Sequence, residues 1–205
     1  LLEALFGART RSAGAVLLDG QPLDLRSPTR AMRAGVALVP EQRERAVFPD
    51  ASLADNLSIV ELPRWWRRGR LDRAGERRAA AEDVQAFGVV AGSTRAPMAT
   101  LSGGNQQKVV LAKWLATEPR LVIFDEPTRG IDVGAKHRVY ELMRELTRAG
   151  VAVLMVSSEL PEVIGMSDRI LVMRDGRLAG ELPAGASEEA VLAMATGAAT
   201  EGEAA

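Results

Sequence analysis

Three short runs of apolar residues stand out against the otherwise mixed polarity of this chain. They lie at residues 36–39, 121–124 and 151–156, and each is bounded by polar, proline or glycine residues. Continuous apolar runs of this length are typical of parallel strands that are buried on both faces of a sheet. Between the last two runs, apolar residues recur at helical spacing over residues 134–148, and Gly150 ends the pattern. This order predicts an α/β core with a mostly parallel sheet flanked by helices.

The segment 55–100 differs in character from this core. It is rich in Arg and Ala, is helix-prone and contains no convincing strand. We therefore expect residues 55–100 to form a helical subdomain inserted into an α/β core that comprises 1–54 and 101–197. A hairpin near the end of the core is predicted around Asp175-Gly176, a pair that favours a tight turn. The Ala, Gly and Glu-rich residues 198–205 are expected to form a disordered tail.

Composition limits the class of protein. The chain has 205 residues, 47% of them hydrophobic, a net charge of −1 and no cysteine. Near-neutrality gives no overall attraction to nucleic acid or to an anionic membrane. The lack of cysteine excludes disulfides and thiolate metal sites and fits a reducing compartment. No apolar run approaches the roughly 20 residues of a membrane span, and no signal peptide is visible, so we expect a cytosolic protein.

The most informative motif is Leu-Ser-Gly-Gly-Asn-Gln-Gln-Lys at residues 101–108, which precedes an apolar helical pattern. Ser102 is suited to cap the helix, while Gly103 and Gly104 allow the backbone to approach a ligand closely. Free N–H groups and the positive end of the helix dipole then suit a phosphate. An ordinary serine cap explains Ser-Gly-Gly by itself, but not the whole run.

A second motif, Leu-Val-Ile-Phe-Asp-Glu-Pro-Thr, occupies residues 121–128. A buried strand that ends in two acids places carboxylates at the C-terminal edge of the sheet, where α/β proteins bind ligands. Asp125 is suited to hold Mg²⁺ directly or through water, and Glu126 to orient or deprotonate an attacking water. The alternative for this motif alone is a strand that runs into an acidic turn.

Together the two motifs resemble the signature motif and the Walker B strand of ABC ATPases, which are P-loop NTPases. The resemblance implies that the chain works with ATP and Mg²⁺, with Asp125 as a metal ligand and Glu126 as a catalytic residue. It also implies contact between the signature motif and the γ-phosphate of ATP on the opposite nucleotide-binding domain. The residues that it assigns to this contact are Ser102, Gly103, Gly104, Asn105 and Gln106.

Three further positions take roles from the same resemblance. Asp132 lies at the place of the D-loop, where the family links the two nucleotide sites, and we count it as catalytic. Ser158 stands where the family usually carries a switch histidine, and we count it as catalytic, although serine lacks a titratable imidazole. Glu41 replaces the usual Gln of the Q-loop; an ionised Glu only accepts hydrogen bonds, but it remains a candidate metal ligand. The single histidine, His137, is expected at the surface.

A Walker A motif appears nowhere in the sequence. The resemblance places it directly before Leu1, because the family's phosphate loop opens the helix that would end near Gly7. We expect the sequence to be truncated at its N-terminus rather than the motif to be lost. We also expect this polypeptide alone not to bind ATP measurably, because the missing loop supplies several charge-assisted bonds of ~1.5–3 kcal/mol each.

Longer runs narrow the resemblance to one group. Residues 105–108, 127–136 and 157–163 together are similar to ribose, xylose and galactoside-type importer ATPases, which carry two nucleotide-binding domains in one polypeptide. Serine at the switch position and Glu41 resemble the C-terminal domain. This implies that the chain is an ATP-hydrolysing part of an ABC importer at the cytoplasmic face of the inner membrane, and that the imported substrate is a monosaccharide. Implied partners are the N-terminal nucleotide-binding domain of the same polypeptide, transmembrane permease subunits and, indirectly, a periplasmic sugar-binding protein.

Two alternatives stay open. One is the ATPase of an importer for nucleosides or an autoinducer-type signal, and the other is a non-transport ABC ATPase. The run Arg-Trp-Trp-Arg-Arg-Gly-Arg at 64–70 also suits nucleic acid, because aromatic side chains stack on bases. Acidic residues just downstream dilute its charge, so a solvated face of the subdomain is favoured, with a permease contact as the second choice. We expect no nucleic-acid partner.

Overall fold

The computed structural model describes residues 1–42, 46–67, 69–130 and 133–197. The chain divides into two compact units, Leu1–Leu154 and Met155–Ala205, which are described one at a time. Among the described residues, no helix combines the length and the apolar character that crossing a bilayer demands.

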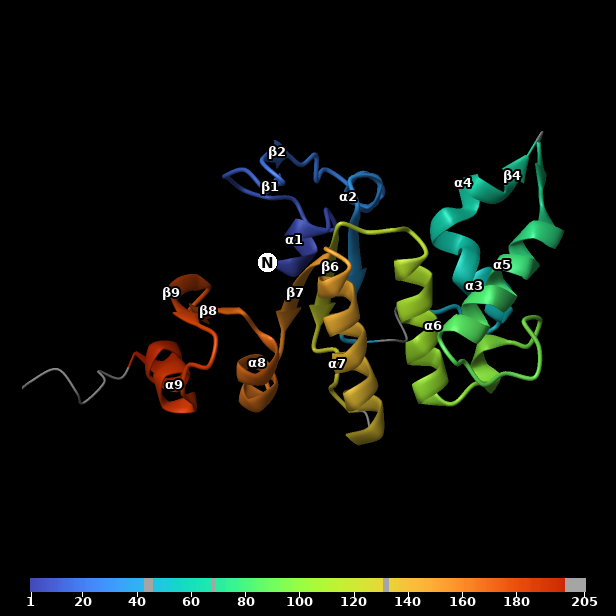
Figure 1. Cartoon of the computed structure of the whole chain (residues 1–205). Helices are drawn as coiled ribbons and strands as arrows, with labels where there is room; N and C mark the ends of the chain where they lie inside the picture. Colours follow the sequence, from blue (N-terminus) through green and yellow to red (C-terminus); the bar gives the residue numbers. More distant parts are fainter. Residues whose placement is uncertain (43–45, 68, 131–132, 198–205) are drawn as a thin grey trace, which may run out of the picture. The chain divides into compact units, whose positions relative to one another are not determined.

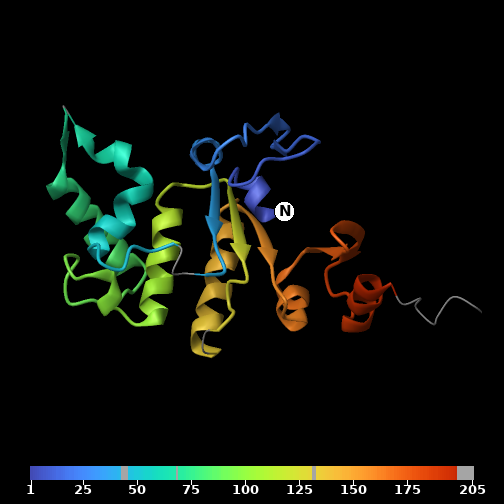
Figure 2. The same cartoon turned by 180° about the vertical axis from the view of Figure 1, so that it is seen from behind.

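The first unit is built on a sheet with the strand order β3-β6-β7. The strands are β3 (Val36–Val39), β6 (Leu121–Asp125) and β7 (Ala152–Val156), so the three apolar runs are confirmed as strands. β3 and β6 are parallel, with Val36 opposite Leu121, and the arrows of all three strands point the same way in Figure 1. The helix α7 (Val133–Arg148) connects β6 to β7, and seen from behind the strands lie in front of it (Figure 2).

One core cluster lies against the sheet and involves the start of the chain. It gathers α1 (Leu2–Leu5), α2 (Pro28–Arg33) and the strands of the sheet, while the short hairpin β1 (Leu17–Leu18) and β2 (Gln21–Pro22) lies between the two helices in sequence. The ring of Phe6 meets Trp114 edge to face, with centroids 5.5 Å apart. Gly7 ends α1 at φ 75°, and a Cβ there would lie 2.7 Å from the main chain of Ser27. The buried members of this cluster are Leu2, Phe6, Leu25, Ala31, Val36 and Ile123.

A second core holds the helical part of the first unit. Its elements are α3 (Leu53–Ser58), the 3₁₀ turn η2 (Ile59–Glu61), α4 (Leu62–Trp65), α5 (Arg73–Ala86), the 3₁₀ turn η3 (Met98–Thr100) and α6 (Gly103–Leu115). Leu53 and Met98 are fully buried and share the cluster with Val109 of α6. The helical core therefore continues into the helix that the signature run begins. Subdomain boundaries at residues 55 and 100 stay a prediction.

The expectation that 55–100 contains no strand is wrong. A small antiparallel hairpin joins β4 (Trp66–Arg67) to β5 (Arg70–Leu71), with Trp66 opposite Leu71. Gly69 adopts φ 78°, a left-handed conformation that glycine reaches without steric cost and that allows the chain to reverse here. Two residues per strand are too few to produce a recognisable alternation in the sequence.

The second unit contains α8 (Leu160–Met166), β8 (Arg169–Arg174), β9 (Arg177–Pro183) and α9 (Glu188–Thr196). The predicted hairpin is confirmed: β8 and β9 are antiparallel, with Arg174 opposite Arg177. Asp175 and Gly176 both have positive φ, 49° and 74°, as the mirror-image turns of tight hairpins require. Ile170, Val172 and Val191 form the centre of its core. The expected tail at 198–205 lies outside the described residues.

Candidate functional site

The signature run begins the helix α6, as predicted, but Ser102 does not cap it with its side chain. Ser102 occupies the N-cap position with extended backbone angles, and its hydroxyl makes no bond to the helix backbone. Instead, its Oγ accepts a hydrogen bond of 3.0 Å from Nδ2 of Asn105. The capping prediction is therefore wrong, because the Asn105 amide takes up the oxygen that a capping serine offers to the first turn.

Two amide side chains of the signature run fix the chain around it. Oδ1 of Asn105 accepts a bond of 2.9 Å from the backbone N–H of Val90. Nε2 of Gln106 donates to the main-chain oxygens of Met98 and Leu101, both at 3.2 Å. Both residues therefore hold the approach to the helix in place. The contact of Gln106 with nucleotide stays a prediction.

The two glycines keep the start of the helix open. Gly104 is exposed, and a Cβ added to it would meet no atom within 4 Å. Gly103 is partly exposed at the first helical position. The first N–H groups of a helix lack partners within the helix and carry the positive end of its dipole. This end of α6 is thus accessible to a bulky anionic group.

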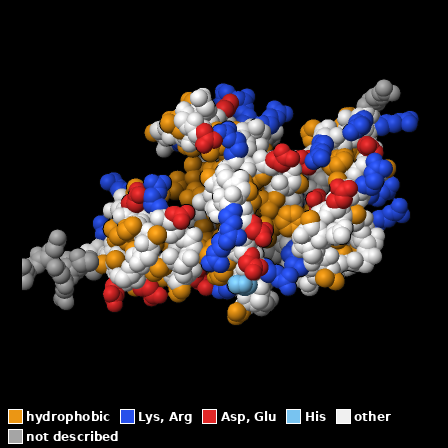
Figure 3. Space-filling model, in the orientation of Figure 1, with side chains coloured by type: hydrophobic (Ala, Val, Ile, Leu, Met, Phe, Trp, Pro, Cys, Tyr) orange, Lys and Arg blue, Asp and Glu red, His pale blue; other side chains and the backbone are white. Residues whose placement is uncertain are grey.

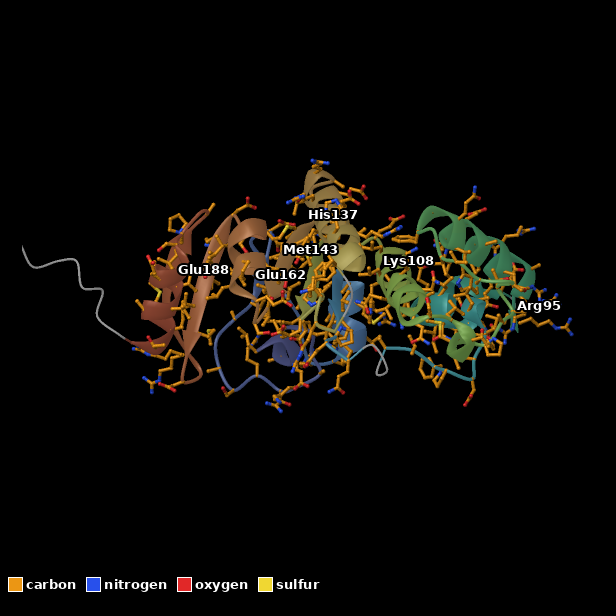
Figure 4. All side chains as sticks on the ribbon, turned by 90° about the horizontal axis from the view of Figure 1, so that it is seen from below. Arg95, Lys108, His137, Met143, Glu162 and Glu188 are labelled. Carbon is orange, nitrogen blue, oxygen red and sulfur yellow. The ribbon has the colours of Figure 1, made fainter. Side chains whose placement is uncertain are left out.

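A cleft of about 450 Å³ adjoins the start of α6. Ser102, Gly104 and Asn105 line it together with residues of α7 and the end of α5. Lys108 lies on the side of α6 between α7 and the helical part of the unit (Figure 4), and its Nζ donates to the main-chain oxygen of Gly88 at 2.5 Å. Burial, followed by the charge of Arg138, lowers the pKa of Lys108. Lys108 and Arg138 line the cleft together with Glu141 and Glu145, so charges of both signs lie near the open helix end.

The second motif places its acids where the sequence predicts them. Val122, Ile123 and Phe124 are fully buried in β6, and the strand ends at Asp125. Glu126 follows with φ 49°, in the left-handed region that residues other than glycine seldom adopt. Such backbone strain gathers at functional sites, where the surrounding structure maintains it. Thr128, two residues on, is buried and anchors the turn in the core.

Three carboxylates influence one another at this edge of the sheet. Burial raises the pKa of Asp125, and the charges of Glu41 and Glu126 raise it further. Glu41 in turn forms an ion pair with Arg129, although the two residues lie 88 positions apart. The structure therefore brings the Q-loop candidate Glu41 together with Asp125 and Glu126. The pairing of Arg129 with Glu41 could not be read from the sequence, because the two residues lie far apart along the chain.

The carboxylates fit a Mg²⁺ ion only in part. No group of three acidic or histidine side chains within the described residues is arranged to hold a metal ion. Mg²⁺, however, commonly uses one or two protein carboxylates and takes its other ligands from phosphates and water. Asp125 has carboxyl oxygens and a raised pKa, and a cation would relieve its repulsion from Glu41 and Glu126. These residues suit a Mg²⁺ that arrives with a nucleotide.

The start of α1 lies at the same edge of the sheet. The carboxylate of Glu3, in α1, also raises the pKa of Asp125. Asp125 therefore faces the N-terminal end of α1, where helix N–H groups point outward.

Two predicted site residues remain, Ser158 and Asp132. Ser158 is exposed and belongs to the second unit, just after β7. Beside it, the hydroxyl of Ser157 accepts from the N–H of Glu159 at 3.0 Å and donates to Glu162 at 2.5 Å. Asp132 lies outside the described residues.

His137 is confirmed as a surface residue of α7 (Figure 4). Its side chain is 68% exposed, and Nε2 lies 3.2 Å from Glu141 one turn along the helix.

Lys113 is a residue that the sequence analysis missed. It lies in α6, is 4% exposed, and donates from Nζ to the main-chain oxygen of Ala46, beyond the Q-loop. Burial lowers its pKa from 10.5 to about 8. A lysine inside the otherwise apolar run 109–115 was the available signal, because buried lysines are rare without a partner.

The fold and this arrangement define an α/β nucleotide-binding domain of the ATP-binding cassette type. The solved dimeric ATP-binding cassette MJ0796, whose post-hydrolysis state is bound to ADP and Pi, superposes with a TM-score of 0.73. It is 23% identical, and the match covers 89% of this chain and 78% of that one. CbiO1 from Clostridium perfringens, part of the ABC transporter complex cbiONQ, gives a TM-score of 0.68 at 23% identity over 88% and 70% of the two chains.

The chain belongs to the ABC transporter family, whose model matches residues 1–129. The arabinose import ATP-binding protein AraG of Burkholderia pseudomallei (strain 1710b) is 50% identical over 95% of this chain and 40% of its own length. The ribose import ATP-binding protein RbsA 1 of Agrobacterium fabrum is 46% identical over 96% and 39%. The xylose import ATP-binding protein XylG of Pseudomonas syringae pv. tomato is 48% identical over 88% and 35%. The chain thus spans about 40% of the length of the curated relatives that it matches.

Proposed function

We propose that this chain is the C-terminal ATP-binding domain of an ABC importer ATPase that drives the uptake of a monosaccharide. The open start of α6, where Gly104 leaves room for a ligand, carries the proposal. The names of the relatives support the substrate class, because arabinose, ribose and xylose are all monosaccharides. The partners in this proposal are the N-terminal nucleotide-binding domain of the same polypeptide, permease subunits and, indirectly, a periplasmic sugar-binding protein.

The first role of the chain is to complete the ATP site of the other domain. Backbone N–H groups of Gly103, Gly104 and Asn105 donate to the γ-phosphate, and Ser102 adds its hydroxyl. Because Asn105 and Gln106 tie the approach to this helix in place, the donors are arranged before the nucleotide arrives. Pre-arranged donors lose little entropy on binding.

The second role belongs to the chain's own nucleotide site. Asp125, with Glu41 beside it, would hold Mg²⁺, and a bound ion would supply positive charge against the phosphates. Glu126 orients the attacking water, and the charge of Arg129 keeps the carboxylate of Glu41 from repelling the phosphates. Glu41 and Ser158 depart from the usual Gln and His, so this site turns over more slowly than the one that Ser102 serves. Asp132 links the two sites.

The chain works at the cytoplasmic face of the inner membrane, held there by the permease. In this arrangement ATP binding closes the two nucleotide-binding domains, and the closure is transmitted to the permease. The permease and the periplasmic protein choose the sugar. The pentoses in the names of the relatives are therefore the first substrates to test.

The test compares two substitutions in the full-length polypeptide that contains this chain, assembled with its permease. Ser102→Arg fills the open helix end with a bulky side chain, and we expect it to lower the ATPase rate by about tenfold or more. Glu126→Gln removes only the base of the slower site and should cost less. A larger loss from Glu126→Gln would refute the ordering, and equal, negligible losses would refute the proposed role of the signature run.

A further inference from the structure

Lys108 is a basic residue of the signature run to which the proposed function gives no role. The chain contains three lysines, Lys108, Lys113 and Lys136, and the first two lie in α6. Lys113 is 4% exposed, so a reagent in solvent does not reach its amine. Lys108 is only partly buried and lines the cleft of about 450 Å³ at α6, α7 and the end of α5, a volume in the range of small-molecule sites. Of the two amines in α6, only that of Lys108 is therefore open to a small reagent.

One hydrogen bond and one neighbouring charge act on this amine. Nζ of Lys108 donates to the main-chain oxygen of Gly88 at 2.5 Å, which holds the side chain against the turn that follows α5. Burial, followed by the charge of Arg138, lowers the pKa of Lys108. At neutral pH a larger share of Lys108 than of an ordinary lysine is therefore the neutral amine, which is the nucleophilic form. The bond to Gly88 uses one N–H and leaves the lone pair of the nitrogen available.

Arg138 provides a second positive group in the same cleft. It is exposed on α7, and it forms no hydrogen bond or ion pair with another side chain in the part of the chain that the structure describes. A guanidinium group with free N–H groups suits a phosphate, which it binds through two parallel hydrogen bonds. Because the charge of Arg138 acts on Lys108, the two cations are close enough for one small molecule to contact both.

Two glutamates of α7 also line the cleft, whereas its other lining residues carry no charge. Glu141 lies 3.2 Å from Nε2 of His137, and Glu145 lies one turn further along the helix. Figure 3 shows basic and acidic side chains close together around the pale-blue histidine of α7. A carboxylate beside the ammonium group would raise the pKa of Lys108, but this pKa is lowered. At the amine itself, burial and the charge of Arg138 therefore outweigh both carboxylates.

We infer that Lys108 and Arg138 form a modification site at which an acyl phosphate acylates Lys108. Arg138 binds the phosphate group of the reagent, and the neutral amine attacks the acyl carbon. A nitrogen–carbon bond forms, the bond between the acyl carbon and the phosphate oxygen breaks, inorganic phosphate leaves, and the surplus proton on the nitrogen passes to water. The product is a neutral amide, so α6 loses a positive charge one turn from Gly104. An effect of this loss on ATP turnover rests on the proposed function, whereas the acylation does not.

The test incubates the full-length polypeptide that contains this chain with acetyl phosphate, without nucleotide, and follows the acetylation of each lysine by peptide mass spectrometry. We expect Lys108 to react at least about threefold faster than Lys136, and Lys113 to stay unmodified. Arg138→Gln should slow the reaction of Lys108 about fivefold, because it removes both the phosphate contact and the charge that favours the neutral amine. Arg144→Gln is the matched control and should leave the rate unchanged, since Arg144 is exposed on the same helix but does not line the cleft.

An uncharged reagent, the N-hydroxysuccinimide ester of acetic acid, separates recognition of the phosphate from reactivity of the amine. This ester has no phosphate for Arg138 to bind, so the preference for Lys108 over Lys136 should be smaller with it than with acetyl phosphate. Three results would overturn the inference: equal rates at Lys108 and Lys136, equal rates at Lys108 in Arg138→Gln and Arg144→Gln, and a preference for Lys108 no larger with acetyl phosphate than with the ester. The first and third need only wild-type protein, so they do not depend on how the variants fold. Failure here leaves the proposed function and its ATPase test unaffected.

Discussion

Lys113 donates from its ammonium group to the main-chain oxygen of Ala46 and so joins the helix of the signature run to the segment that follows Glu41. The lysine is almost fully buried, and its Nζ lies 5.8 Å from the centre of the Trp114 ring. The bond spans 67 positions of sequence. This hydrogen bond connects α6, whose start is proposed to bind one nucleotide, to the segment after Glu41, which lies at the edge of the sheet proposed to bind the other nucleotide.

Replacement of Lys113 by methionine tests this buried charge through its pH dependence. Burial lowers the pKa of Lys113 from 10.5 to about 8, so between these values the unfolded chain binds the proton more tightly than the folded chain. The free energy of unfolding of the wild type should therefore rise with pH across this window, by up to about 3 kcal/mol relative to Lys113→Met. Below about pH 8 the difference between the two proteins should be constant. Denaturation curves at several pH values, followed by circular dichroism, measure it; differences that do not vary with pH would contradict the assignment.

The substitution Gly104→Ala should change the stability of the fold and the ATPase rate in opposite directions. A Cβ at Gly104 meets no protein atom, so the helix should gain about 0.5–1 kcal/mol of stability from the loss of glycine's backbone freedom. The same Cβ would stand where the phosphate of a nucleotide approaches, so the ATPase rate of the full-length protein should fall. Gly165→Ala is the matched control, because that glycine also lies in a helix, α8, with open space around it. If both variants retain full activity, the start of α6 does not contact a nucleotide.

Asp125→Asn should stabilise the folded protein while it removes the metal ligand. Burial, with the charges of Glu41 and Glu126, raises the pKa of Asp125, so the ionised carboxylate destabilises the fold at neutral pH. This penalty is fully present above the raised pKa and disappears as the pH falls below the ordinary value of 3.8. The melting temperature of Asp125→Asn should therefore exceed that of the wild type at pH 7, and the gap should close in acid. A variant that melts below the wild type at pH 7 would show that other contacts of Asp125 outweigh this repulsion.

Ser58→Ala tests a buried polar network in the helical part of the first unit. Glu76 is 1% exposed; its Oε1 accepts from the hydroxyl of Ser58 at 2.5 Å and its Oε2 from Arg73 at 3.0 Å. Loss of the hydroxyl leaves a buried carboxylate oxygen without its donor, which should cost about 2–3 kcal/mol of unfolding free energy. Ser93→Ala removes a hydroxyl at an exposed position and should cost below about 0.5 kcal/mol. Equal effects in urea denaturation would mean that solvent reaches Glu76.

Features with a local physical cause could be predicted from the sequence. The three buried strands, the Asp175-Gly176 turn and the open helix start at Gly104 follow from runs of apolar residues and from glycine, and the structure contains each of them. The position of Asp125 at the end of a buried strand was likewise fixed by its neighbours along the chain. The predicted roles of the site residues in ATP turnover remain predictions.

Two expectations failed, each for its own physical reason. Ser102 was expected to cap α6 with its side chain, but its hydroxyl accepts a hydrogen bond from the side-chain amide of Asn105 instead of from a backbone N–H of the first turn. The β4–β5 hairpin escaped notice because its strands have two residues each and depend on a turn at Gly69.

Taken alone, the sequence determined the kind of domain, since the order of apolar runs and glycine-rich motifs is a property of neighbouring residues. Only the tertiary structure decided which distant side chains meet. Arg129 forms an ion pair with Glu41, Lys113 donates a hydrogen bond to Ala46, and Arg67 lies opposite Arg70. The first two contacts depend on how separate elements pack, and the third on the register of a turn. The energies of burial and of charge at such contacts depend on distances in space, which spacing along the chain does not give.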